Sequence, residues 1–306
     1  MSASAGSAEL AALLAALEHA PSALRRPGAT VEEMREPGRV RDPDGATITA
    51  VAGTRYESVD AGGVRGELVT APTADRRRTM LHLHGGGFVL CGLDSHRSFV
   101  SHLSAATGAT ILHVDYRLAP EHPFPAGLDD ACAAHRWLLD AFDAPMAISG
   151  DSAGGGLAMG VVLRARDEGV PLPTGVALIS PWVDLTLTAP SLRARAQTDP
   201  LLGPDNLRTM VDAYLAGHDA RDPLASPRFA DLAGLPPMFV LAGGREILHD
   251  DAVGLHAAAL AADIDAVLHV RDDLFHVFPL FAGTLPEADE ALRAIGSHLE
   301  PLWRTP

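Results

Sequence analysis

Short apolar runs recur along the chain, and many of the segments between them have the length of helices. Two early runs, Ile48–Val51 and Val64–Thr70, predict antiparallel strands separated by a polar, glycine-containing stretch. Each later run predicts one strand, at Thr79–Leu83, Ala109–Val114, Met146–Ser149, Val176–Ile179, Met238–Ala242 and Ala266–Val270. Between several of them lie helix-like segments, at Leu128–Leu139, Ala153–Asp167, Ala252–Ala262 and Ala288–Leu299. This alternation predicts an α/β fold with a mostly parallel central sheet and helices on both faces.

Two regions depart from this alternation. An Ala/Leu-rich stretch over Ser7–His19 predicts a helix, and a Pro/Gly/Arg-rich connector follows it through Gly45. We therefore expect residues 1–45 to precede a main domain at residues 46–306. After the fourth of the later runs come more than fifty residues with two helix-like stretches, Thr186–Gln197 and Asp205–Ala216. That interval is too long for a plain connection, so it predicts a helical insertion around 186–222, over the carboxyl edge of the sheet.

Composition and charge limit the partners of this chain. It has 306 residues, of which 47% are hydrophobic, so it can bury a substantial core in one or two domains. Its formal net charge of −15 at pH 7 repels nucleic-acid phosphates and anionic lipid headgroups. The single basic cluster, at residues 76–78, is expected in a solvated loop before a strand. We expect neither a nucleic-acid nor a membrane partner.

The usage of lysine and cysteine excludes several chemistries. The sequence holds no Lys, which excludes Schiff-base enzymes, P-loop NTPases and Ser-Lys hydrolases. Cys91 and Cys132 are too few for a disulfide framework or a thiolate metal site, which fits a reducing, cytoplasmic compartment. The apolar run Leu10–Leu17 follows Glu9 and is shorter than the roughly 18 residues that suggest a spanning helix. It predicts neither a signal peptide nor a membrane anchor.

A candidate nucleophile lies between a predicted strand and a predicted helix. Residues 150–154 read Gly-Asp-Ser-Ala-Gly and fit the G-x-S-x-G pattern. In a strand-turn-helix context this pattern is typical of a nucleophile elbow, where the glycines permit a tight turn and the oxygen of Ser152 is exposed. The alternative interpretation is an ordinary glycine-rich turn or a phosphate cradle at a helix N-terminus.

A glycine run supplies candidate donors for an oxyanion. Residues 84–88 read His-Gly-Gly-Gly-Phe and follow the predicted strand Thr79–Leu83. Such a run lets backbone N–H groups point at one position, and we expect those of Gly85, Gly86 and Ala153 to stabilise a tetrahedral oxyanion. The alternative is a flexible loop. His84 is interpreted as a buried histidine that holds this loop by hydrogen bonds, and not as the catalytic base.

A serine nucleophile needs a histidine base and an acid. His276 follows the last predicted strand, as the chain order Ser-acid-His of α/β-hydrolases requires, and its alternative is a surface loop histidine. The acid should follow the strand Met238–Ala242, where Glu246 lies nearest the strand end. The other candidate carboxylates are Asp250, Asp251, Asp272 and Asp273.

Several histidines lie near the glycine run without suggesting a metal site. His82 and His84 alternate along a strand before the glycines begin, and no neighbouring Asp or Glu completes a coordination pattern. We therefore expect no metal and no cofactor.

Four motifs in this order resemble those of the hormone-sensitive-lipase-like branch of the α/β-hydrolases, a large group of bacterial carboxylesterases. They occupy residues 84–88, 115–126, 150–155 and 180–185, and the resemblance covers the chain from Met80 onward. It implies the α/β-hydrolase fold, a helical cap formed by the N-terminal segment and the insertion, and a homodimer through the last strand and terminal helix. The chain departs from the family at Glu246, where many members carry Asp. A subset that resembles acetyl-hydrolases and lactone hydrolases carries Glu there.

The residues and the resemblance together predict a serine carboxylesterase. Ser152, His276 and Glu246 would form the triad, and the substrate would be a short-chain acyl ester, a small lactone or an acetylated metabolite. One alternative is an amidase or arylformamidase that uses the same triad. The other is a non-catalytic small-molecule binding protein on the hydrolase fold.

Overall fold

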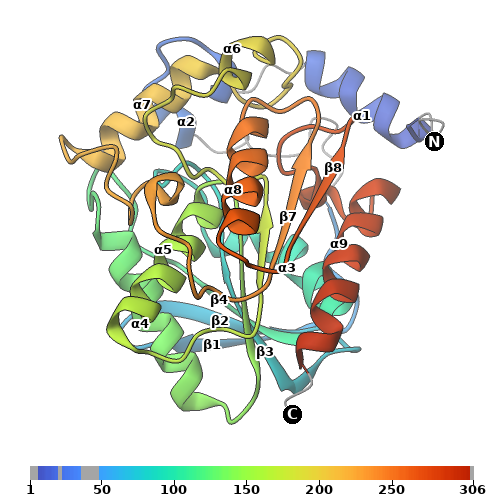
Figure 1. Cartoon of the computed structure of the whole chain (residues 1–306). Helices are drawn as coiled ribbons and strands as arrows, with labels where there is room; N and C mark the ends of the chain where they lie inside the picture. Colours follow the sequence, from blue (N-terminus) through green and yellow to red (C-terminus); the bar gives the residue numbers. More distant parts are fainter. Residues whose placement is uncertain (1–5, 20–22, 36–47, 304–306) are drawn as a thin grey trace.

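A single sheet organises the chain in the computed structural model, which describes residues 6–19, 23–35 and 48–303 (Figure 1). The strands run in the order β1-β2-β4-β3-β5-β6-β7-β8. They are β1 (Arg55–Asp60), β2 (Arg65–Thr70), β3 (Asp75–Leu83), β4 (Ala109–Val114), β5 (Met146–Asp151), β6 (Val176–Ile179), β7 (Met238–Gly243) and β8 (Ala266–Arg271). β2 pairs antiparallel with β1 and β4, and every other pairing is parallel. The predicted α/β architecture is confirmed.

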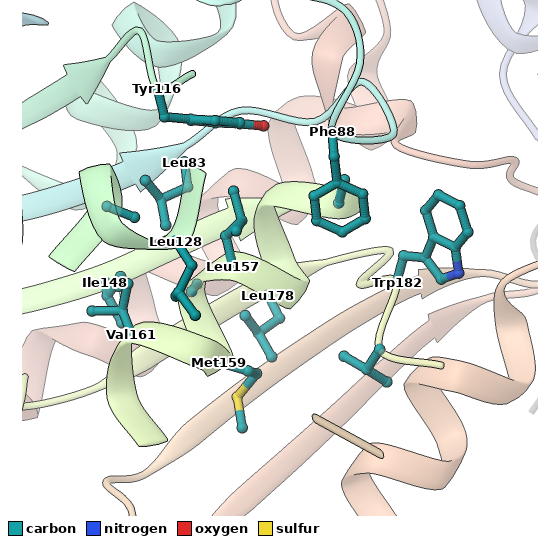
Figure 2. Packing of buried hydrophobic residues seen from close by; sticks show 14 of the residues in the cluster. Leu83, Phe88, Tyr116, Leu128, Ile148, Leu157, Met159, Val161, Leu178 and Trp182 are labelled. Atoms are coloured by element: carbon teal, nitrogen blue, oxygen red, sulfur yellow. The ribbon is translucent and has the colours of Figure 1, made fainter. Parts of the chain in front are cut away.

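Helices cover both faces of the sheet and build two cores. The helices are α1 (Ala8–His19), α2 (Val31–Arg35), α3 (Leu93–Thr107), α4 (Ala126–Ala141), α5 (Ala153–Glu168), α6 (Ser191–Ala194), α7 (Pro204–Leu215), α8 (His249–Ala261) and α9 (Pro286–Leu299). Leu81 and Leu112 pack with α4, α5 and α8, where Figure 2 shows Leu128 beside the sheet. Their chain neighbours Met80 and Ile111 pack with α3 and α9. Since successive strand residues point to opposite faces, nearly continuous apolar runs are needed here.

The N-terminal segment and the insertion meet at one end of the molecule, at the top of Figure 1, where α1, α2, α6 and α7 are labelled. The N–H of Gly203 donates to Leu24 O at 3.0 Å, just after the 3₁₀ turn at Ala23–Arg25. Arg35, at the end of α2, donates to Val89 O and Ala119 O at 2.5 and 2.7 Å. These contacts join the N-terminal segment both to the insertion and to the main domain.

The strand predictions hold for every run after residue 60, with small changes of boundary. The predicted strand Ile48–Val51 is wrong, because residues 48–51 have no regular structure and the first strand is β1. β1 is an edge strand with most residues exposed, so its polar sequence resembles a loop. The basic cluster at residues 76–78 was expected in a loop and instead lies in β3, which begins at Asp75.

The helix predictions differ in two places. The stretch Thr186–Gln197 was expected to be helical, but only α6, at Ser191–Ala194, forms there. The sequence analysis assigned no helix to residues 93–107, because their many Ser and His residues obscure the apolar spacing of α3. Part of the predicted connector, residues 20–22 and 36–45, lies outside the described residues. Within the described ranges, no helix has the length and apolar character needed to cross a bilayer.

Two helical glycines offer a matched test of the packing between α3 and α9. A Cβ at Gly296 of α9 would lie 2.2 Å from Ala106 O of α3, whereas at Gly254 of α8 the nearest atom is Arg228 Nε at 3.4 Å. Gly296→Ala should lower the free energy of unfolding by about 1–3 kcal/mol through overpacking. Gly254→Ala should raise it by up to about 1 kcal/mol, because Ala is the better helix former. Chemical denaturation of both variants measures this, and equal effects would contradict the close helix contact.

Candidate active site

The turn after β5 holds Ser152 in an unusual backbone conformation. Its φ is +52° and its ψ is −122°, a region that costs a non-glycine residue about 1–3 kcal/mol. The N–H of Ser152 donates to Ile179 O at 2.9 Å, and its carbonyl accepts the N–H of Trp182 at 2.9 Å. A Cβ at Gly154 would lie 2.0 Å from Leu83 O, so only glycine allows α5 to begin this close to β3. The predicted strand-turn-helix elbow is present.

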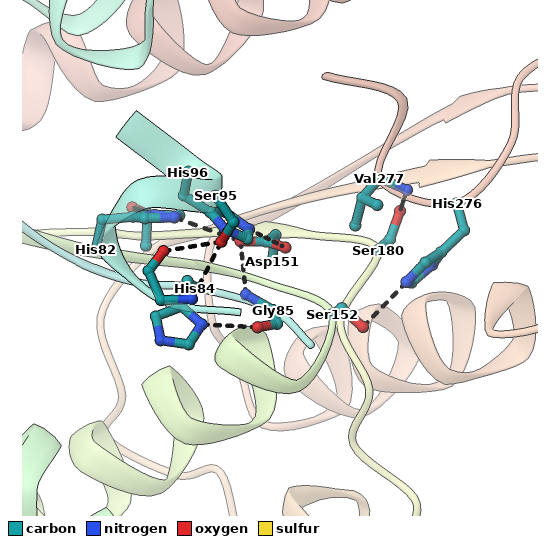
Figure 3. Close-up of polar contacts among 12 residues, drawn as sticks. His82, His84, Gly85, Ser95, His96, Asp151, Ser152, Ser180, His276 and Val277 are labelled. Atoms are coloured by element: carbon teal, nitrogen blue, oxygen red, sulfur yellow. Dashed lines mark hydrogen bonds and ion pairs between the residues drawn. The ribbon is translucent and has the colours of Figure 1, made fainter. Parts of the chain in front are cut away.

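His276 faces the hydroxyl of Ser152 from the loop after β8. Figure 3 shows its ring pointing toward the side chain of Ser152. His276 Nε2 lies 3.0 Å from Ser152 Oγ, and the exposed fractions of His276 and Ser152 are 3% and 7%. Burial lowers the pKa of His276, but the contact with Glu246 and the negative charges of Glu246, Asp199 and Asp151 together outweigh burial and raise the pKa above its ordinary value. With Nδ1 protonated, Nε2 can accept the proton of the serine hydroxyl.

Glu246 lies on the other side of His276, fully buried in the loop after β7. Its Oε2 is 3.5 Å from His276 Nδ1, an ion-pair distance that is too long for a normal hydrogen bond. Oε2 also accepts the hydroxyl of Ser180 at 2.6 Å, and Ser180 Oγ accepts the N–H of Val277 at 3.0 Å. Contacts of this kind are often long in an unliganded site and shorten when substrate binds.

Ser180 is a site residue to which the sequence analysis gave no role. It follows β6 directly, and its hydroxyl joins the loop of Glu246 to the loop of His276. Its position at the carboxyl end of a parallel strand, in the run at residues 180–185, was the available signal.

The glycine run reaches Ser152 with one difference from expectation. The N–H of Gly85 donates to Asp151 Oδ1 at 3.0 Å, so it is occupied by a carboxylate and Gly85 is a poor candidate for an oxyanion donor. Within the described residues, the N–H groups of Gly86 and Gly87 have no acceptor. Ala153 is the first residue of α5, and the first N–H groups of a helix have no acceptor within the helix. The N–H of Ala153 can therefore donate to an oxyanion.

A buried polar cluster of Asp151 and the histidines at positions 82, 84 and 96 lies against the glycine run (Figure 3). Asp151 Oδ1 and Oδ2 lie 3.3 and 3.4 Å from Nε2 of His82 and His96, and these histidines hold the pKa of Asp151 below its usual range despite burial. His84 Nδ1 donates to Gly85 O at 2.7 Å, and Tyr116 donates its hydroxyl to His84 O at 2.7 Å. Burial lowers the pKa of His84 to about 3, so its ring is neutral. This matches the expected structural role of His84.

Among the described residues, none of the other candidate acids forms an ion pair with His276. Asp250 accepts the N–H of Ser191 at 2.8 Å, in the insertion. Asp251 is buried and accepts the N–H groups of Val183 and Asp184 at 2.8 and 2.9 Å, and burial raises its pKa to about 7. Asp272 is exposed and Asp273 half-buried. Of the candidate carboxylates, the structure brings Glu246 to the histidine.

The described residues contain no group of three or more His, Cys, Asp or Glu side chains arranged to hold a metal ion. The histidines at positions 82, 84, 96 and 113 do gather behind the glycine run, but as neighbouring rings, with centroids 5.5–6.4 Å apart for the five pairs in contact.

Comparison with known proteins gives consistent results. A family model described as alpha/beta hydrolase fold matches residues 80–280. The chain is 43% identical over 230 residues to the acetyl-hydrolase of Streptomyces hygroscopicus, covering 74% of this chain and 77% of that protein. It is 39% identical over 236 residues to an esterase of Acinetobacter venetianus, covering 76% and 78%.

Solved structures resemble this chain over nearly its full length. An esterase from the bacterial hormone-sensitive lipase family superimposes with a TM-score of 0.91 at 38% identity, covering 98% of this chain and all of that one. An esterase/lipase from an uncultured bacterium gives a TM-score of 0.90 at 39% identity, covering 97% and 99%.

Covalent labelling tests the geometry of the site. A fluorophosphonate probe should phosphonylate Ser152 and leave Ser180 unmodified, because Ser152 Oγ faces a histidine whereas Ser180 donates to a carboxylate. Labelling needs the neutral form of His276, whose pKa is raised, so its rate should fall with decreasing pH through a midpoint above 6.5. Peptide mass spectrometry and the rate at each pH measure this. A midpoint below 6.5, or modification at Ser180, would contradict the arrangement.

Proposed function

We propose a triad and a substrate class for this chain, which belongs to the α/β-hydrolase family and is a serine carboxylesterase of its bacterial hormone-sensitive-lipase-like branch. The triad is Ser152, His276 and Glu246. The observation that carries this proposal is the 3.0 Å contact between His276 Nε2 and the oxygen of Ser152 on a strained elbow. The names of the relatives favour hydrolysis over the non-catalytic alternative.

The reaction begins when Ser152 Oγ attacks the carbonyl carbon of the ester and His276 Nε2 takes the hydroxyl proton. Glu246 keeps the proton of His276 on Nδ1 and stabilises the imidazolium that forms. His276 then protonates the leaving alcohol, and an acyl group stays on Ser152. Water attacks this acyl-enzyme with His276 again as the base, which releases the acid and restores the serine.

The oxyanion of each tetrahedral intermediate accepts the N–H groups of Gly86, Gly87 and Ala153. Gly87 replaces Gly85 in this proposal, because the N–H of Gly85 is bonded to Asp151. Donors held in place before the reaction need no reorganisation when charge develops on the carbonyl oxygen. Asp151 therefore contributes by fixing the start of the loop.

The substrate is a small ester with a short acyl chain, such as an acetyl ester. Similarity to an acetyl-hydrolase supports this choice, and a small lactone or an acetylated metabolite belongs to the same class. We infer that the described part of the N-terminal segment 1–45, which is residues 6–19 and 23–35, forms a helical cap with the insertion around 186–222. The bonds from Gly203 to Leu24 and from Asn206 Nδ2 to Arg26 O, at 3.0 and 3.1 Å, support this.

Two further features concern the molecule as a whole. β8 is an edge strand of the sheet, and Val267 on it is 41% exposed, so a second copy can pair along this edge to form a homodimer.

The free thiols of Cys91 and Cys132 support a cytoplasmic location, where thiols stay reduced. Cell fractionation tests the location, and recovery outside the cytoplasm would refute it.

Kinetics on matched substrates test the function. We expect p-nitrophenyl esters with short acyl chains to be turned over faster than long ones and faster than the matched anilide. Ser152→Ala should lower kcat by about 10⁶-fold while the protein melts at the same temperature. Equal turnover of anilide and ester would favour the amidase alternative. Retention of a tenth of the activity in Ser152→Ala would refute a serine nucleophile.

A second set of variants tests the acid. Glu246→Gln keeps the shape of the side chain but can select the wrong tautomer of His276, so kcat should fall by about 10⁴-fold. Asp272→Asn is the matched control, because Asp272 is exposed and its backbone lies against Gly244, in the loop that carries Glu246. Its kcat should stay within about tenfold of the parent value. Near-normal kcat in Glu246→Gln would remove Glu246 from the triad.

Light scattering tests the dimer. The parent protein should have twice the chain mass of 32.0 kDa, and Val267→Asp should have the mass of one chain because a charge is placed on the pairing edge. Ser58→Asp is the control: it adds the same charge on β1, at the opposite edge of the sheet, and should leave the mass at two chains. A parent of one chain mass would refute the dimer.

A further inference from the structure

The loop that carries the acid is enclosed by the insertion. We call residues 244–248 the acid loop and residues 191–202 the cap segment. Thr198 Oγ1 lies 3.0 Å from Arg245 O, and Arg245 Nε donates to Thr198 O at 3.2 Å. Thus the residue just before Glu246 bonds to the cap segment through both its backbone and its side chain.

The residue just after the acid is bonded in the same way. Ser191 donates its hydroxyl to Ile247 O at 2.7 Å, and its Oγ accepts the N–H of Asp250 at 3.2 Å. Asp199 Oδ2 accepts the N–H of Ile247 at 3.0 Å. The cap segment therefore holds the chain on both sides of Glu246.

Asp199 is the most unusual member of this set. It is fully buried, and its second oxygen, Oδ1, accepts the N–H groups of Leu201 and Leu202 at 2.9 and 3.1 Å. Among the described residues no Arg or His forms an ion pair with it. All three groups that bond to Asp199 are backbone N–H donors. The amide of an Asn at this position would therefore place its own NH₂ donor against one of these N–H groups. A buried position with only donors around it requires a carboxylate.

The charge of Asp199 also reaches the base. Three carboxylates raise the pKa of His276 by their negative charge: Glu246 from the acid loop, Asp199 from the cap segment and Asp151 from the end of β5. After Glu246, Asp199 is the next of these groups to raise the pKa of His276. Burial raises the pKa of Asp199 itself, and the charge of His276 and the three N–H bonds act in the opposite direction.

We propose that Asp199 is a positioning residue for the triad, which fixes the peptide after Glu246 and supplies a second negative charge to the imidazolium from the cap. The inference rests on the proposed triad. It makes the cap segment part of the machinery that places the acid, in addition to covering the site. A displacement of the cap segment would then displace Glu246 relative to His276.

The test compares two cap carboxylates on p-nitrophenyl acetate over a range of pH. Asp199→Asn should lower kcat by about 10–10²-fold, because a small misplacement of a catalytic group has effects of this size, with KM nearly unchanged. The acidic limb of kcat/KM should move to lower pH, because the imidazolium loses a negative neighbour. Asp205→Asn removes the same charge from an exposed position on α7 and should change neither quantity.

Two more variants separate position from charge. Ser191→Ala removes only uncharged contacts to the acid loop, so kcat should fall while the acidic limb stays in place. In the Glu246→Gln background, Asp199→Asn should add little to the loss of kcat, since its positioning effect acts through the acid, but it should still move the acidic limb to lower pH, since its charge acts on His276 directly. If Asp199→Asn does not fold, Ser191→Ala and Thr198→Ala together carry the test, and an unchanged kcat in both would overturn the inference.

The outcomes distinguish this inference from the proposed triad. If Glu246→Gln keeps its activity, the triad itself is wrong. If Glu246→Gln loses activity while Asp199→Asn keeps the parent kcat and the parent pH profile, only the role of Asp199 is refuted. A loss of kcat in Asp199→Asn with no movement of the acidic limb would reject the electrostatic part.

Discussion

The hydrogen bonds on both sides of Ser152 hold this residue at φ +52°, and the rest of the site is arranged around that turn. The bonds come from the end of β6 and from the chain just after it, so the elbow depends on the sheet order that places β6 beside β5. β3, the other neighbour of β5, brings the glycine run to the same edge. One strained residue thereby fixes where the proposed nucleophile meets the glycine run and the proposed base.

Much of this arrangement could be predicted because the fold places function at strand ends. The runs at Thr79–Leu83 and Met146–Ser149 are mostly apolar and fully buried, since parallel strands covered on both faces need such sequences. Their carboxyl ends lead directly to the glycine run and to Ser152. The edge strand β1 was missed for the opposite reason: most of its residues are exposed, which makes its sequence polar.

The remaining features depend on contacts between residues far apart in the chain. The N–H of Gly85 donates to Asp151, which lies 66 positions later in the chain. No sequence pattern around the glycines indicates this hydrogen bond. Asp199 and Ile247 are separated by 48 positions and both lie in irregular chain. Hydrophobic periodicity carries no information on such polar contacts, because they are set by how two loops pack once the sheet has formed.

The proposed cap consists of two pieces of chain that bond to each other, through Gly203 and Leu24, and the later piece also bonds to the acid loop. This restricts how substrate preference can be altered by exchanging parts between related esterases. A transplanted insertion would meet a foreign N-terminal segment on one side and a foreign acid loop on the other. Positions such as 191 and 199 therefore have to match the recipient, while the outward face of α7 is free to differ.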